Sequence, residues 1–122
     1  MAISDDENIE LRRLPPQELE AEQMVLGACL LEPAVVIPNL RVRPEDFYRT
    51  AHGHLLAAMR RMHERGTDID LITLDAEMRN TKELAALGGA GYLSQIISEC
   101  PTAAGVKSHE KLVISAAERR AV

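Results

Sequence analysis

The chain has 122 residues and a formal net charge of −5, and 46% of its residues are hydrophobic while only 2% are aromatic. This length suits one domain, and a core of aliphatic side chains with almost no large rings favours packed helices. The acidic balance argues against a domain that holds nucleic acid by itself, because phosphate binding needs a basic surface.

Secreted and membrane-spanning proteins are also disfavoured. The first residues are acidic and lack the apolar stretch of a signal peptide, and no apolar run approaches the roughly 18 residues of a membrane span. We therefore expect a cytoplasmic protein. Cys29 and Cys100 are lone thiols without the spacing of metal ligands, so we expect two reduced core residues rather than a disulfide.

Residues 1–14 are polar, and we expect a flexible N-terminal arm before a domain that covers residues 15–122. The first helix is predicted over about residues 16–31. Pro16 suits the first helical position because its missing N–H is not needed there, and acidic residues in the first turns suit the helix dipole. At about 100° per residue, one line of this helix carries Leu19, Leu26 and Leu30.

A short second helix is predicted over residues 34–37, where Pro38 ends it. The third helix is predicted over Thr50–Arg65, because basic residues occupy its last turns and Gly66 supplies a C-terminal stop. The connector at residues 43–48 carries the only phenylalanine of the chain, and we expect it to anchor the core.

Asp70 or Thr73 is expected to cap the fourth helix, which ends around Asn80. The glycine-rich segment 88–91 is predicted to be a loop. It separates the fourth helix from a fifth helix over about residues 92–100.

The sixth helix is predicted to start after Pro101, with Thr102 as its cap. Its apolar pattern is still in phase at Val122, with neither Gly nor Pro to end it, so we expect the natural chain to continue. Together these elements predict an all-α fold, a compact bundle of about six short helices with orthogonal packing.

Motifs for catalysis and cofactor binding are missing from the sequence. Residues 104–108 look like the end of a phosphate loop, but Val106 stands where that motif requires a glycine before the lysine. The segment 88–91 lacks the third glycine of a dinucleotide-binding fingerprint. Neither His52 nor His54 has a second His or a Cys four residues further on, as a helical zinc site needs. We predict no catalytic, cofactor-binding or metal-binding residues.

Two polar residues interrupt the apolar faces of the predicted helices. Glu22 falls between Cys29 and Leu26 on the apolar arc of the first helix, and His52 heads the apolar line of the third. A carboxylate on a core face is costly unless it is paired. The two residues could form an acid–base couple or a buried pair that locks two helices together, and we favour the structural pair.

Four parts of the chain resemble, in order and spacing, the N-terminal domain of bacterial replicative DNA helicases of the DnaB type. They are LPPQ at 14–17 with EAEQMVLG at 20–27, PEDFYRTAH at 44–52, GTDIDLITL at 66–74, and GGAGYL at 88–93 with PTAA at 101–104. Each motif is weak alone, but four in register over about residues 14–122 form a specific signal.

The resemblance implies a helical head that forms a collar on a hexameric helicase ring and receives the helicase-binding domain of primase. In that family a helical hairpin, a linker and a RecA-type motor follow the head, and ATP and Mg²⁺ act in the motor. This sequence contains none of the motor motifs, so we expect no ATP hydrolysis and no unwinding. Without the hairpin, we expect a monomer or a weak dimer, and we expect no direct binding to nucleic acid or membrane.

Exposed anchors, rather than a cleft, are what a binding module needs. Glu20 points away from the line of Leu19 and Leu26, and Tyr92 follows a glycine-rich loop that could present its ring. Tyrosine is a common anchor at interfaces because its rigid ring covers area at low entropic cost. We expect Glu20 and Tyr92 to lie on the primase-binding face.

Two other classes remain as alternatives. The helicase-binding domain of primase resembles the same small helical fold, but the proline-led first helix and the Asp-Phe-Tyr segment favour the helicase. A helix-turn-helix DNA-binding domain is disfavoured by the acidity of the chain and by the lack of a helix that carries several basic or amide side chains towards a groove.

Overall fold

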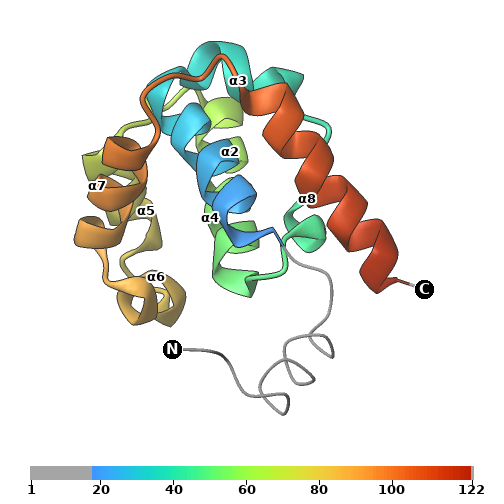
Figure 1. Ribbon diagram of the computed structural model, residues 1–122. Helices are drawn as coiled ribbons and strands as arrows, with labels where there is room; N and C mark the ends of the chain where they lie inside the picture. Colours follow the sequence, from blue (N-terminus) through green and yellow to red (C-terminus); the bar gives the residue numbers. More distant parts are fainter. Residues whose placement is uncertain (1–17, 122) are drawn as a thin grey trace, which may run out of the picture.

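The computed structural model describes residues 18–121, and within them every regular element is helical (Figure 1). The predicted arm at 1–14, residues 15–17 and Val122 lie outside the described residues, and the first helix, predicted from about residue 16, begins at Leu19. The elements are α2 (Leu19–Leu31), α3 (Pro33–Asn39), the 3-10 turn η1 (Pro44–Asp46), α4 (Thr50–Arg65), α5 (Leu71–Met78), α6 (Lys82–Leu87), α7 (Ala90–Glu99) and α8 (Val106–Arg120). The prediction of an all-α bundle of short helices is confirmed.

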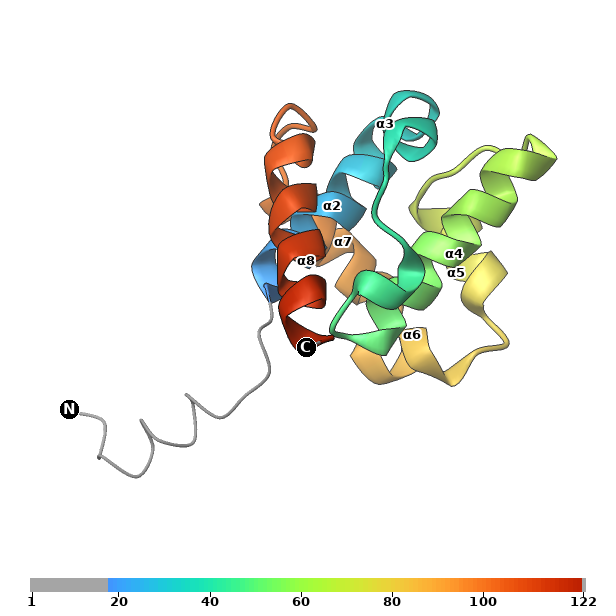
Figure 2. The same ribbon diagram turned by 90° about the vertical axis from the view of Figure 1, so that its right-hand side faces the viewer.

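Helix α2 occupies the centre of the bundle. It packs against α3, α4, α7 and α8, and Figures 1 and 2 show α7 and α8 on either side of it. Its buried side chains meet those of α4 in a core without solvent access, and the fully buried members include Val25, Leu26, Leu55, Leu56 and Met59. Every other element contacts α2 or α4, so these two helices form the centre on which the rest of the bundle packs.

Two predicted helix ends are confirmed by their capping geometry. Asp70 and Thr73 form a capping box at the start of α5, in which Asp70 Oδ1 accepts from the Thr73 N–H at 2.9 Å and Thr73 Oγ1 accepts from the Asp70 N–H at 2.9 Å. Gly66 ends α4 in the left-handed conformation, with φ of 74°. Both residues named as alternative caps of α5 thus take part in one cap.

Other boundaries differ from those predicted. Helix α6 was not predicted, because its six residues bury only Leu84 and so carry no helical periodicity. Helix α3 continues through Pro38 to Asn39. Helix α8 begins at Val106, since Thr102 Oγ1 accepts from the Ala104 N–H at 3.1 Å and makes a turn before the helix instead of a cap.

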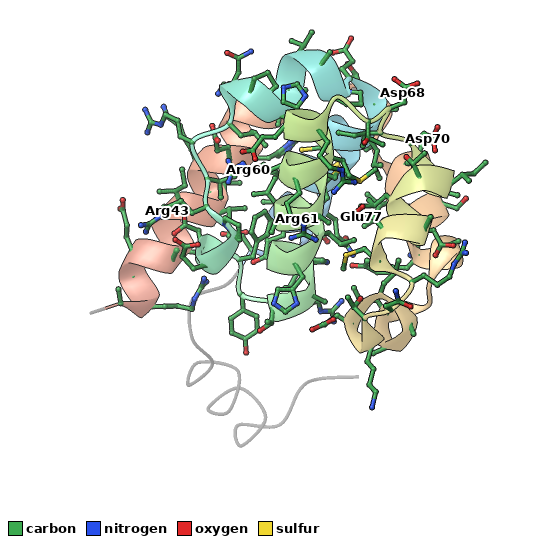
Figure 3. The ribbon with its side chains drawn as sticks, turned by 180° about the vertical axis from the view of Figure 1, so that it is seen from behind. Arg43, Arg60, Arg61, Asp68, Asp70 and Glu77 are labelled. Carbon is green, nitrogen blue, oxygen red and sulfur yellow. The ribbon has the colours of Figure 1, made fainter. Side chains whose placement is uncertain are left out.

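The α4–α5 contact includes a set of surface ion pairs. Glu77 on α5 accepts from Arg65 at 2.7 Å and lies 3.6 Å from Arg61. Figure 3 shows Arg61 and Glu77 in the space between the two helices. The exposed arginines limit what these pairs contribute to stability, but the pairs fix how α5 lies against α4.

The extended segment 40–43 is held between α4 and α8 by polar side chains. From α4, Arg60 donates to the carbonyl oxygen of Val42 at 2.7 Å. From α8, the buried carboxylate of Glu110 accepts from the N–H groups of Arg41 and Val42, the second at 2.9 Å. Burial alone would raise the pKa of Glu110, but these N–H groups and the Lys107 ammonium favour the charged form, and the net pKa is lowered.

We expect Glu110→Gln to lower the free energy of unfolding by about 1–2 kcal/mol at pH 7, because a neutral amide accepts these hydrogen bonds less strongly. A lowered folded-state pKa stabilises the fold above the ordinary pKa of the carboxyl group, and this stabilisation is lost as the pH falls through the folded value. The difference from wild type should therefore shrink by about pH 3. Denaturant unfolding at both pH values measures it, and an equal difference at both would contradict this account.

Both cysteines are free and buried, as predicted. Burial raises the pKa of Cys29 to about 12 and also raises that of Cys100, so neither carries the thiolate that reactive cysteines need.

Among residues 18–121, no helix is both long and apolar enough to cross a bilayer.

Candidate functional site

Glu22 on α2 and His52 on α4 form a buried pair, which confirms the prediction that they lie within hydrogen-bonding reach. The Nδ1 atom of His52 lies 2.8 Å from Oε1 of Glu22, and the two side chains are 0% and 1% exposed. The pair joins the first turns of two helices at the centre of the bundle.

Glu22 also anchors the backbone that leads into α4. Its Oε2 accepts from the N–H of Tyr48 at 2.6 Å, and its Oε1 accepts from the N–H of Arg49 at 3.4 Å. These N–H groups come just before α4, where they have no partner within the helix. A buried carboxylate is tolerated here because three donors surround it.

Tyr92 is buried, so the expectation of an exposed ring was wrong. Only 9% of the residue is exposed, its ring stacks on that of His52 with centroids 5.9 Å apart, and its hydroxyl lies 2.6 Å from His52 Nε2. The reason is that α7 starts at Ala90, directly after the two glycines, which places Tyr92 inside the helix on the same face as Ile96. The helical spacing of Tyr92, Leu93 and Ile96, which puts all three on one apolar face, indicates that Tyr92 is buried.

These contacts form one continuous chain of hydrogen bonds. With a carboxylate at Glu22 and a neutral imidazole at His52, the proton between them sits on Nδ1, and Nε2 accepts from the Tyr92 hydroxyl. The Tyr92 oxygen in turn accepts from Nε2 of Gln23, at 3.2 Å. The order Tyr–His–Glu resembles a catalytic relay, but His52 is completely buried, so no substrate reaches it.

Glu20 is exposed, and it lines a groove of about 670 Å³ between the first half of α2, the end of α7 and α8. The groove has an acidic rim, to which Glu18 and Glu99 also contribute. Its apolar part includes Met24 and Leu112, and Leu112 is 45% exposed. We call this surface the α2–α7–α8 groove; Gln23, the outer end of the buried hydrogen-bond chain, lies along it.

Sequence reasoning found one residue of this groove and missed the rest. Leu112 lies beside the buried face of α8 and not on it. An exposed leucine at such a position is a sequence signal for a binding surface. The sequence could not predict that Glu99 and Glu20 line the same groove, because this depends on how α7 packs against α2. Among residues 18–121, no group of three or more His, Cys, Asp or Glu side chains could hold a metal ion.

Comparisons with known proteins agree with this arrangement. Residues 14–115 match the family model of the DnaB-like helicase N-terminal domain. The chain is 45% identical over 102 residues to the replicative DNA helicase DnaB of Geobacillus stearothermophilus, and 43% identical over 102 residues to the replicative DNA helicase DnaC of Bacillus subtilis. In both cases the match covers 83% of this chain and 22% of the relative, so the chain spans about a fifth of the length of these helicases.

A solved structure shares the fold as well. The crystal structure of the N-terminal domain of DnaB helicase from Mycobacterium tuberculosis superposes with a TM-score of 0.80 and is 40% identical in sequence, over 88% of this chain and 78% of that one. Neither alternative, a primase domain or a helix-turn-helix protein, is needed to explain a match over most of the chain. The chain belongs to the family of DnaB-like helicase N-terminal domains.

Proposed function

We propose that this chain is the non-catalytic head of a replicative DNA helicase, which forms part of the collar of a hexameric ring and recruits primase during DNA replication. Its partners would be the helicase-binding domain of primase and the neighbouring protomers of the ring. ATP and Mg²⁺ would act in the motor of the intact helicase and not in this domain, whose sequence lacks a phosphate-loop motif.

The observation that carries the proposal is an open groove with an acidic rim on a domain of this family. The polar groups suited to proton transfer, Glu22 and His52, are buried and occupied by one another. Glu20, which we predicted from the sequence to lie on the primase-binding face, lines the groove. The surface is therefore equipped to recognise a protein, whereas the buried polar groups stabilise the fold.

Sedimentation tests this proposal. The chain alone should be a monomer or a weak dimer at micromolar concentration, and it should form a stoichiometric complex when mixed with the C-terminal domain of primase. Neither sample should hydrolyse ATP, with or without single-stranded DNA. Independent sedimentation of the two domains at tens of micromolar would contradict primase recruitment by the head, and ATP turnover would contradict its non-catalytic role.

A further inference from the structure

Three glutamates, Glu18, Glu20 and Glu99, line the α2–α7–α8 groove, together with one histidine, His109 on α8. Glu18 directly precedes α2, Glu20 lies in the first turn of α2, and Glu99 is the last residue of α7, so the acidic residues come from two parts of the fold. Among residues 18–121, no lysine or arginine lines the groove. Carboxylates gathered on one rim repel one another, and a cation placed between them removes that repulsion.

Gln23 adds an acceptor to the same rim. The buried chain from Glu22 through His52 and Tyr92 uses the amide nitrogen of Gln23 as its last donor. Its carboxamide oxygen and its second N–H are then available to a partner. Tyr92, although buried, is in this way a positioning residue for the groove.

The apolar part of the groove requires an apolar side chain on the partner. Leu112 is 45% exposed on α8, and Met24, which is partly buried, lies along the same groove. A flexible methionine beside an exposed leucine can adapt to the shape of an inserted side chain. An apolar strip with an acidic border matches an amphipathic helix whose apolar face is flanked by basic residues.

We infer that the α2–α7–α8 groove receives a cationic amphipathic helix of the partner, with Lys or Arg side chains opposite Glu20 and Glu99 and an apolar side chain on Met24 and Leu112. This inference rests on the proposed function, because it describes the chemistry of the primase segment that the head would bind. It also makes the acidic charge of the groove a determinant of specificity, since a segment with acidic flanks would be repelled.

Charge reversal with a matched control tests the inference. Glu99→Lys reverses one rim charge at the end of α7, where a lysine also suits the helix dipole. Glu64→Lys makes the same change in net charge near the end of α4, on an exposed residue that does not line the groove. Against the primase C-terminal domain, measured by calorimetry in about 0.1 M salt, Glu99→Lys and Glu20→Lys should each weaken binding about tenfold. Glu64→Lys should change it less than twofold.

A second pair of variants tests the apolar contact. Leu112→Ser should weaken binding about tenfold, whereas Ile72→Ser, at a leucine-sized residue that is 75% exposed on α5, should leave binding unchanged. Circular dichroism melting should show that all the variants stay folded.

The outcomes separate this inference from the proposed function. Wild-type binding that is insensitive to Glu20→Lys, Glu99→Lys and Leu112→Ser would overturn the groove as the docking site while leaving primase recruitment intact. Equal losses for Glu64→Lys and Glu99→Lys would show that only net charge matters. A change in self-association instead of primase binding would assign the groove to a second copy of the chain. No binding by the wild-type chain would overturn the proposed function and this inference with it.

Discussion

Replacing Glu22 by alanine should lower the free energy of unfolding by about 3–5 kcal/mol, because it removes one partner of a buried pair and leaves the other without compensation. The Nδ1–H of His52 and the N–H groups of Tyr48 and Arg49 would all lose their acceptor. For a domain of about 100 residues, this loss corresponds to a fall in Tm of more than about 10 °C. Thermal and urea unfolding monitored by circular dichroism measure it.

Glu20→Ala is the matched control, two residues away on the same helix and exposed. It should change the free energy of unfolding by less than about 0.5 kcal/mol. If Glu22→Ala does not fold, Tyr92→Phe serves in its place. This variant removes only the hydroxyl that lies 2.6 Å from His52 Nε2 and should cost about 1–2 kcal/mol. Equal stabilities of the Glu22 and Glu20 variants would contradict a structural role for the pair.

Gly53→Ala should destabilise the fold by about 2–3 kcal/mol, because there is no room for a methyl group where α4 crosses η1. A Cβ at this position would lie 2.3 Å from the carbonyl oxygen of Pro44, and a backbone atom cannot move aside as a flexible side chain can. The helix would have to shift away from η1, and the segment leading into α4 would lose its contacts. Equilibrium unfolding in urea measures the cost.

Gly91→Ala provides a control with the opposite sign. Gly91 lies in the first turn of α7, and a Cβ there would meet nothing within 4 Å. Alanine should stabilise the helix by about 0.5–1 kcal/mol, since glycine loses more conformational freedom on folding. A Gly53→Ala variant that is as stable as Gly91→Ala would show that α4 and η1 do not need this close approach.

The parts of the structure that depend on helical periodicity were predictable from the sequence. Glu22 and His52 were placed together because each lies on the apolar face of a helix, near its start, and a buried carboxylate needs a partner. The end of α4 at Gly66 and the capping of α5 by Asp70 were predictable because these signals are local.

Features that depend on tertiary contacts could not be predicted in this way. Helix α6 is too short to show a period, and it is held by the packing of Leu84. Tyr92 was misplaced because its glycines suggested a flexible loop, whereas Gly88 and Gly89 make the tight turn from α6 into α7 with φ of 118° and 63°. The groove joins residues from three helices, so only Glu20 could be nominated before the packing was known.

The most direct test of the central claim, that this head binds primase through the α2–α7–α8 groove, is a two-dimensional NMR titration of the labelled chain with the C-terminal domain of primase. The amide signals of Glu20, Glu99 and Leu112 and of their neighbours on α2, α7 and α8 should shift or broaden in a saturable manner. Those of Ile72 and the rest of the exposed face of α5 should stay unchanged. Perturbations centred on α5, or none at concentrations of tens of micromolar, would contradict the account.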